Sequence, residues 1–234
     1  MKSIVFIAPP AAGKGTQSSL ICGKYNIPHI STGDILRKRL LVNDEQGIYI
    51  KKQLEKGHLV SDELMIELIE ERICEDDCNN GYVLDGFPRT VIQAREYEEM
   101  LNRLNKDLGL VLLLDVSEET AKKRILGRMS CPTCGRVYNS FVEEAKPKVE
   151  NLCDKCNSIL KKRDDDNYET LSNRYQTYFE KTKPLIEFYE SRNALYHIDG
   201  NGSVENTFRQ IEKTIENVNL NFDSHVKKKS FKLR

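Results

Sequence analysis

The sequence predicts an α/β protein in which helices cover both faces of one parallel β-sheet. Short, continuous apolar segments alternate along the chain with longer segments whose apolar residues recur at helical spacing. With 234 residues, 39% of them apolar and 31% charged, the chain has the size and balance of one globular domain with insertions. Strands that alternate with helices are joined as parallel neighbours. We therefore expect ligands at the carboxyl ends of the strands.

The N-terminal half begins with a strand and continues through several helices. Ser3–Ala8 is a short, β-branched apolar run, which predicts a buried strand. Lys14–Tyr25 is predicted to be a helix with Leu20, Ile21 and Tyr25 on its apolar side. Apolar spacing and capping residues predict the remaining elements: helices over Asp34–Leu41, over Gly47–Lys56 and from Ser61, with Leu64, Leu68 and Ile69 inward, and a strand over Tyr82–Asp85.

The C-terminal half repeats the alternation around one segment of different character. Residues 127–163 are polar and rich in cysteine and turn residues, which favours a small β structure. The other expected elements are helices over Thr90–Asn105, Glu118–Leu126 and Val204–Asn217, strands over Leu110–Val116 and Leu195–Ile198, and one long helix over Glu169–Ser191 with Leu171, Tyr175, Tyr178 and Phe179 on its apolar face. A basic segment through Arg234 is interpreted as a frayed tail.

The first strand leads into a loop of small residues that ends at Lys14 and Thr16. Small residues let backbone N–H groups approach phosphate oxygens, and a helix N-terminus adds partial positive charge. Lys14 supplies a full charge, and the Thr16 hydroxyl can lie near a phosphate-bound Mg²⁺. The sequence therefore predicts a phosphate-binding loop, although Ala8 occupies a position that is usually glycine.

Four of the seven cysteines form two Cys-x-x-Cys pairs, which 18 residues separate. Two such pairs can place four thiolates tetrahedrally around one Zn²⁺. Four protein ligands leave no open position, so the predicted zinc is structural. The ligands are Cys131, Cys134, Cys153 and Cys156, whereas Cys22 and Cys74 are interpreted as small core residues.

Bulk properties exclude several classes of protein. The formal net charge is zero, which argues against a polyanion-binding protein, and no apolar run approaches the roughly 18 residues of a membrane-spanning helix. No secretory leader precedes the first strand, so we expect a cytoplasmic protein, with organelle targeting left open if the N-terminus was trimmed. Residues 120–163 nevertheless carry eleven Lys and Arg against four Asp and Glu, which leaves a zinc-ribbon nucleic-acid binder as a rival.

Six arginines accompany the predicted phosphate loop. Four of them lie near a helix start or past a strand end, and Arg124 and Arg128 share one helix face. Guanidinium groups match the oxygens of a transferring phosphoryl group, over which negative charge is spread. The six arginines are Arg37, Arg89, Arg124, Arg128, Arg163 and Arg174.

With these motifs in order, the chain resembles the adenylate kinase family, in its long form with a zinc-bearing lid. The match spans about residues 3–217 and rests on Gly-Lys-Gly-Thr-Gln17, Ser31-Thr-Gly-Asp-Ile-Leu-Arg37, Asp85-Gly-Phe-Pro-Arg-Thr90, Gly135-Arg-Val-Tyr138 and Arg163-x-Asp-Asp. The resemblance implies a P-loop NTPase-type sheet with a small helical insert for the nucleoside monophosphate (NMP) and a small β lid. It divides the chain into core segments 1–30, 61–126 and 165–218, an NMP-binding domain 31–60, a lid 127–164 and a tail 219–234.

The resemblance also implies roles for individual residues. Lys14, Arg89, Arg128, Arg163 and Arg174 would act on the transferring phosphoryl group. Thr16 and Asp85 would hold Mg²⁺ through water. ATP would contact Ala11, Ala12, Gly13, Lys14, Gly15, Thr16, Arg124, Arg128, Val137 and Tyr138. AMP would contact Thr32, Arg37, His58, Leu59, Val60, Gly86, Phe87, Pro88, Arg89, Gln93, Arg163 and Arg174, with Gln93 reading the adenine edge.

The implied activity is reversible, Mg²⁺-dependent transfer of the terminal phosphoryl group of ATP to AMP, by a monomer that binds neither nucleic acid nor membrane. A GTP-preferring or other nucleoside-monophosphate kinase is the alternative. A nucleotide-binding protein without turnover is a third possibility. Ala8 and Ala11 stand where the family usually has glycine, so a Cβ is costly there if the backbone needs positive φ. Ile92 replaces the usual proline before Gln93.

Overall fold

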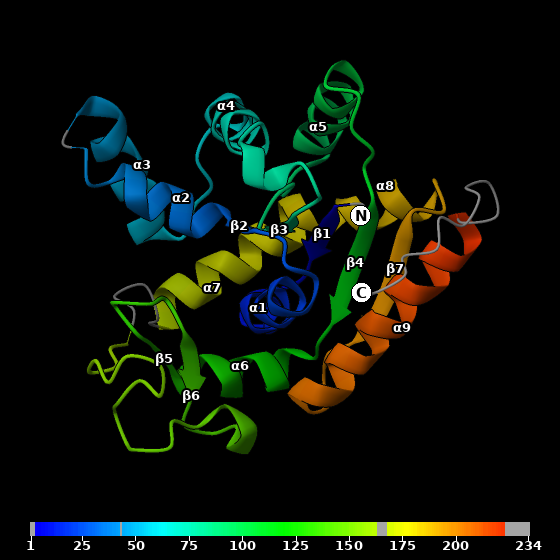
Figure 1. Ribbon diagram of the computed structural model, residues 1–234. Helices are drawn as coiled ribbons and strands as arrows, with labels where there is room; N and C mark the ends of the chain where they lie inside the picture. The colour runs from blue at the N-terminus through cyan, green and yellow to red at the C-terminus, as the bar shows by residue number, and fades with distance from the viewer. Residues whose placement is uncertain (1–2, 43, 163–167, 223–234) are drawn as a thin grey trace.

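The computed structural model describes residues 3–42, 44–162 and 168–222 of the chain (Figure 1). Its centre is a five-stranded parallel sheet in the order β2-β3-β1-β4-β7, which confirms the predicted fold class. The central strand pairs on both sides, with Val5 opposite Leu84 and Val111. The strands are β1 (Ile4–Ile7), β2 (His29–Ser31), β3 (Val83–Asp85), β4 (Leu110–Asp115) and β7 (Leu195–Asp199).

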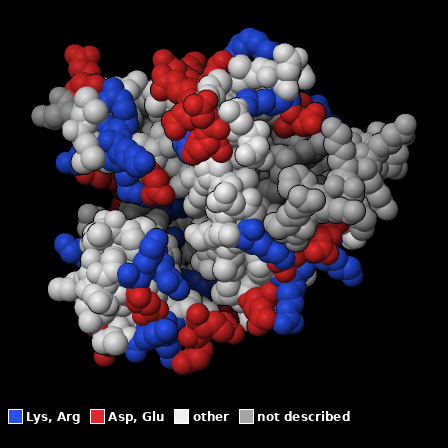
Figure 2. Space-filling model, in the orientation of Figure 1, with Lys and Arg blue, Asp and Glu red and all other residues white. Residues whose placement is uncertain are grey.

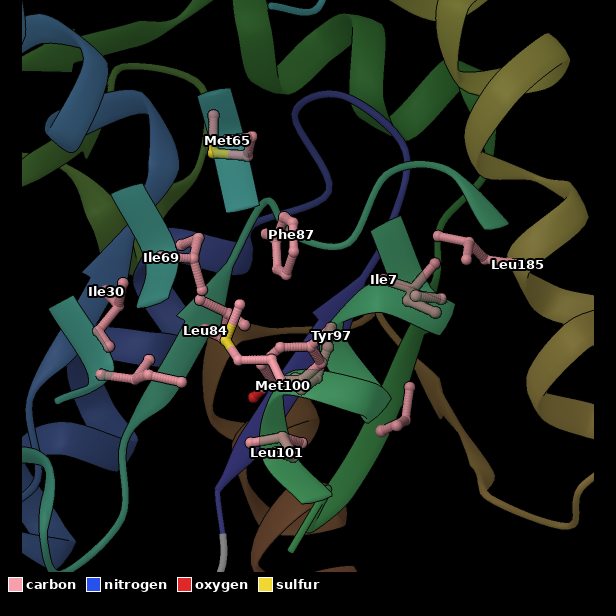
Figure 3. Packing of buried hydrophobic residues seen from close by; sticks show 14 of the residues in the cluster. Ile7, Ile30, Met65, Ile69, Leu84, Phe87, Tyr97, Met100, Leu101 and Leu185 are labelled. Carbon is pink, nitrogen blue, oxygen red and sulfur yellow. The ribbon is translucent and has the colours of Figure 1, made fainter. Parts of the chain in front are cut away.

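Side chains of successive strand residues alternate between two apolar layers. Ile4 and Phe6 pack in one cluster with Ile21 and Ile211, whereas Val5 and Ile7 pack in the other (Figure 3). One face of the sheet is thus covered by α1 (Lys14–Tyr25) and α9 (Val204–Phe222). The other is covered by α4 (Asp62–Ile73), α5 (Val91–Arg103) and α8 (Pro184–Glu190), and the short η1 (Asp76–Cys78) follows α4.

Two small inserts project from this core. Helices α2 (Thr32–Arg39) and α3 (Glu45–Lys56) follow β2. An antiparallel hairpin of β5 (Arg128–Ser130) and β6 (Val137–Asn139) follows α6 (Glu118–Leu126) and leads to η2 (Glu143–Ala145). In Figure 1 the two inserts lie at upper and lower left, with α7 between them, and Figure 2 shows a recess between them that has Lys and Arg side chains at its margins.

The predicted long helix over Glu169–Ser191 is wrong, because the structure has three elements there. Helix α7 (Tyr168–Thr177) passes into a π-helical turn, η3 (Tyr178–Thr182), before α8 begins at Pro184. Proline has no backbone N–H and cannot continue an α-helical ladder, so the break falls before it. The π-turn also shifts the apolar face. Leu171, Tyr175 and Tyr178 are buried as predicted, but Phe179 is 51% exposed.

Smaller differences concern element ends and single apolar residues. Helices α2 and α3 each begin two residues before the predicted start, after the N-caps Ser31 and Asp44. Leu20, predicted to be buried, is 38% exposed. Cys74 is exposed and Cys22 half-buried, so the core interpretation is wrong for Cys74. Strand β2 was not predicted, because three residues are too few to carry a period. Within the described ranges, no helix is both long and apolar enough to cross a membrane.

Candidate active site

The predicted phosphate loop connects the carboxyl end of β1 to the first turn of α1. It lies at the centre of the sheet, where the connection after β1 runs to one side, to β2, and the connection after β3 runs to the other, to β4. Gly13 takes φ 96° at the N-cap of α1, and the amides of Thr16 and Gln17 donate to its carbonyl at 3.1 Å. Ala11 has φ 60°, so the alanine that replaces a family glycine is in the left-handed region, while Ala8 is buried at the strand end.

Lys14 reaches back along the loop and donates to the carbonyl oxygens of Ala8 and Pro9, both at 3.4 Å. The pKa of Lys14 is lowered to about 8, mainly by burial, and the charges of Arg89, Arg128 and Arg174 contribute to this shift while Asp85 opposes it. The structure therefore brings one ammonium and three guanidinium groups within electrostatic reach of one another. Such a cluster favours a polyanion between them.

Asp85 ends β3 beside this cluster. Its Oδ2 lies 3.4 Å from His29 Nε2, and a Cβ on Gly15 would be 3.8 Å from it. Burial alone would raise the pKa of Asp85, but His29, Lys14 and Arg89 together lower it below its ordinary value. An ionised carboxylate next to the phosphate loop fits Mg²⁺, which binds through water and a few carboxylate or hydroxyl oxygens. Thr16 provides a hydroxyl in the first turn of α1.

Arg89 is held in place after the turn that follows β3. Its Nε donates to the Gly86 carbonyl at 2.7 Å, and the Thr182 hydroxyl donates to the Arg89 carbonyl at 3.0 Å. Gly86 has φ 88°, and a Cβ there would lie 2.5 Å from Thr32 Oγ1 and 2.9 Å from an Arg89 nitrogen. Glycine is therefore required where the backbone passes between these two side chains.

Apolar packing of Phe87 and Pro88 holds the turn after β3 in place. Phe87 is fully buried and meets the Tyr97 ring edge to face, with 5.4 Å between ring centroids. Pro88 is buried beside it, and Thr32 donates to the carbonyl oxygens of Asp85 and Gly86 at 3.3 and 3.2 Å. The predicted residues of this segment thus form one rigid unit at the edge of the sheet.

Gln93 lies in the first turn of α5 and is 2% exposed. Its Oε1 accepts from the Arg89 backbone N–H at 2.7 Å, and its Nε2 donates to Asp62 Oδ1 at 2.7 Å. Thr90 caps the helix by accepting from the Gln93 N–H at 3.0 Å, and donates to Asp62 Oδ2 at 3.3 Å. The orientation of the Gln93 carboxamide is therefore fixed by three residues at the starts of α4 and α5, which are Asp62, Arg89 and Thr90.

The remaining residues predicted to contact AMP lie around α2 and the end of α3. Arg37 is paired with Asp34 of its own helix at 2.5 Å. Gly57, with φ 72°, ends α3, and the next residues, His58 and Leu59, border a recess of about 340 Å³ between α3 and α7. His58 is exposed, while Val60 is buried.

On the other side of the loop, Arg124 of α6 donates to the Ala12 carbonyl at 3.0 Å and to the Gly202 carbonyl at 3.3 Å. In the hairpin Val137 is half-buried, whereas Tyr138 is buried with its hydroxyl donating to Cys153 Sγ at 3.4 Å. The Tyr138 side chain therefore faces the cysteines, which leaves its backbone as the part that a nucleotide can contact. Arg163 lies outside the described residues.

The four predicted cysteine ligands meet at the turn that joins β5 to β6. The Sγ atoms of Cys131, Cys134, Cys153 and Cys156 all lie within 4.8 Å of one another, so they could hold a metal ion. Each pair folds as a matching knuckle, in which the amide of Gly135 or Asn157 donates back to the first cysteine at 3.0 or 2.8 Å. Both residues have positive φ. Four thiols in this arrangement suit Zn²⁺.

Several neighbours of the site were not singled out by the sequence. The sequence predicts Asp62 only as part of a helix start and Thr182 only as part of a long helix. His29 and Gly202 belong to the unpredicted strand β2 and to a loop before α9. None of these four has a spacing motif that would mark it, because each meets the site only through the tertiary fold.

Comparison with known proteins identifies the family. A sequence model of the adenylate kinase family matches residues 6–194. The chain is 44% identical to the adenylate kinase of Archaeoglobus fulgidus over 216 residues, which cover 92% of this chain and 99% of the relative. It is 44% identical to that of Kosmotoga olearia, with 92% and 100% covered, and 43% identical to that of Clostridium novyi, with 91% and 98% covered. The chain therefore belongs to the adenylate kinase family of nucleoside-monophosphate kinases.

Proposed function

We propose that the protein is an ATP:AMP phosphotransferase, which transfers the terminal phosphoryl group of ATP to AMP and gives two ADP. The observation that supports this best is the cluster of Lys14, Arg89, Arg128 and Arg174. Lys14 belongs to the phosphate loop, and the Arg89 backbone N–H donates to the Gln93 carboxamide, so a loop for phosphates and an amide for a base both adjoin the cations. The geometry suits two nucleotides whose phosphates meet at the cluster.

The chain's own residues position the reactants and compensate charge. Lys14 and the loop amides would hold the phosphates of ATP, and Arg89 would hold the phosphate of AMP. Arg128 and Arg174, with Arg163 by resemblance, would stabilise charge on the transferring oxygens. Mg²⁺, held through water by Thr16 and Asp85, supplies further charge neutralisation when bound. No general base is required, because positioning and charge compensation carry the rate.

Exclusion of water is the remaining requirement, because water would otherwise attack the triphosphate. The inserts α2–α3 and β5–β6 flank the cluster, and we propose that both close on it, as NMP-binding domain 31–60 and lid 127–164. Arg37 would exchange Asp34 for the AMP phosphate, and Arg124 would release the loop carbonyl to pack on the ATP base.

We also propose that the four cysteines hold one structural Zn²⁺ that folds the lid, since the segment is too small to build its own core. That the protein is a monomer and acts in the cytoplasm stays a prediction from the sequence.

The test is a coupled assay of ADP formation across four triphosphates and four monophosphates. We expect ATP with AMP to have the highest kcat/KM. Faster turnover with GTP would reassign the triphosphate site, and Lys14→Met should abolish turnover with every pair. A gel shift run alongside tests the nucleic-acid alternative: nanomolar RNA binding without ADP formation would replace the proposed activity.

A further inference from the structure

We propose that Asp62 is a positioning residue that fixes the orientation of the Gln93 carboxamide, and thereby selects AMP against 6-oxopurine monophosphates such as IMP. This inference rests on the proposed function, in which Gln93 reads the base. It assigns a specificity role to the first turn of α4, an element outside the helix that carries Gln93.

The contacts on the amide are of opposite kinds at its two ends. The Arg89 backbone N–H can only donate, and it meets Gln93 Oε1 at 2.7 Å. At the other end a carboxylate oxygen of Asp62 accepts from Gln93 Nε2 at 2.7 Å. Rotating the amide by half a turn would place N–H against N–H and oxygen against oxygen. Both contacts therefore favour the same orientation.

The Asp62 side chain is itself held in position by Thr90 and by its place in the first turn of α4. Its second oxygen accepts from the Thr90 hydroxyl at 3.3 Å, while Thr90 accepts from the Gln93 backbone N–H. Asp62 stands at the first position of α4, after the N-cap Ser61, where a carboxylate is also favoured by the helix dipole. Because Gln93 is 2% exposed, water cannot readily replace a lost partner.

Orientation matters because the two base classes present mirrored edges. Adenine offers an exocyclic N–H donor beside a ring-nitrogen acceptor, and the carboxamide matches it with one acceptor and one donor. A 6-oxopurine offers an acceptor beside a donor, so it matches the flipped amide. In the observed orientation, one lone pair of Oε1 and one N–H of Nε2 are left for the base. Without Asp62 only the Arg89 contact opposes the flip.

The experiment measures kcat and KM with AMP and with IMP, at saturating ATP, for wild type and for Asp62→Ala, Asp62→Asn and Glu63→Ala. Glu63 is exposed in the same helical turn, so its variant removes the same dipole interaction without touching Gln93. The D62N variant keeps a carbonyl oxygen at this position that can accept from Nε2. Melting temperatures and the KM for ATP report any general damage.

We expect D62A to raise the KM for AMP and to lower the AMP-to-IMP ratio of kcat/KM by about tenfold or more, since misplaced polar groups discriminate strongly. D62N should keep the ratio within about threefold of wild type, and E63A should leave it unchanged. The KM for ATP should not move in any variant.

The inference is overturned if D62A keeps the wild-type ratio, even with a lower melting temperature, or if D62N loses it as fully as D62A. Wild-type turnover of AMP and a Gln93→Ala variant separate this failure from that of the proposed function. Absence of ADP from ATP and AMP in the wild type would refute the proposed activity itself. Normal turnover together with an unchanged KM for AMP in Q93A would refute the base-reading role on which the inference depends.

Discussion

At the scale of single residues, the charged form of Lys14 is disfavoured until phosphates bind. Lys14 is half-buried and lies near three guanidinium groups, and desolvation together with these charges brings its pKa to about 8. Asp85 opposes this effect. A polyphosphate would reverse the balance, since an opposite charge favours the protonated amine. A bound polyphosphate would thus offset the cost of placing these cations together.

Proton uptake should therefore accompany ATP binding at alkaline pH. Below pH 7 the free Lys14 is already charged, whereas at pH 8.5 most of it is neutral and must bind a proton when the phosphates raise its pKa. Calorimetry in buffers of different ionisation enthalpy should show roughly 0.7 proton taken up per nucleotide at pH 8.5 and little at pH 6.5. The apparent affinity should fall as the pH rises through 8.

Lys14→Met should abolish this uptake, and Lys24→Met provides the matched control, because Lys24 lies on the same helix and pairs with Glu212 at the surface. Equal uptake in wild type and K14M would contradict the assignment of the proton to Lys14.

Ala11 carries backbone strain that its family position usually avoids. Its left-handed conformation costs a residue with a Cβ about 1–2 kcal/mol, and glycine would lose part of this gain to the entropy of the unfolded chain. Ala11→Gly should therefore raise the free energy of unfolding by about 0.5–1 kcal/mol in urea denaturation. Ala12→Gly, at a buried neighbour without positive φ, should lower it by about 1 kcal/mol. Destabilisation by A11G would show that φ at this position carries no strain.

At this scale the sequence predicted the residues that belong to spacing motifs. Lys14, Asp85, Arg89 and the four cysteines were identifiable because their chemistry is tied to a loop, a strand end or a knuckle. Asp62 and Thr182 were not, since each acts on Gln93 or Arg89 across a distance in sequence that no local pattern records. The sequence also could not predict that the Tyr138 ring is buried toward the cysteines, because the Gly135-Arg-Val-Tyr138 motif is the same whichever way the ring points.

Among the elements, the cysteine knuckles carry the most testable energetics. Their thiols already converge, and the Tyr138 hydroxyl lowers the pKa of Cys153, which favours the thiolate that a metal requires. Only a small cluster around Tyr138 and Leu160 packs beneath them. The hairpin segment should therefore depend on its metal for folding.

We expect about one zinc per chain, and a strong chelator should unfold the lid before the core. Cys134→Ser should lose the metal and lower the melting temperature of the lid transition, whereas Cys74→Ser, at an exposed cysteine outside the cluster, should do neither. Elemental analysis and calorimetry check both. A metal-free protein with an unchanged melting curve would refute the zinc site.

Element identity followed from capping and periodicity wherever these agree with the tertiary fold. Ser31, Ser61, Thr90 and Ser117 all cap helices that the sequence placed. The sequence did not predict strand β2, because three residues are too few to show a periodic pattern. The sequence also did not predict the π-turn at η3, because the helical spacing of apolar residues looks continuous across one inserted residue. Pro184 was the one local signal of the break.

For the whole molecule, the arrangement of core and inserts determines how two nucleotides could meet. The cations lie at the carboxyl edge of the sheet, and the inserts α2–α3 and β5–β6 stand on either side of them (Figures 1 and 2). The β5–β6 insert packs Tyr138 and Leu160 against its cysteines in a small cluster separate from the core, which suits it to movement as a rigid body. Helices α2 and α3 instead contribute Leu36 and Ile50 to the larger core cluster. The predicted parallel sheet was sufficient to locate this edge.

The most direct test is titration with a bisubstrate mimic, two adenosines joined by five phosphates, followed by calorimetry and small-angle scattering. We expect one molecule bound per chain, far more tightly than ATP or AMP alone, with a smaller radius of gyration and with most of the affinity lost in Lys14→Met. Binding no tighter than that of ATP, with the scattering profile unchanged, would contradict the claim that one cluster of cations receives the phosphates of both nucleotides.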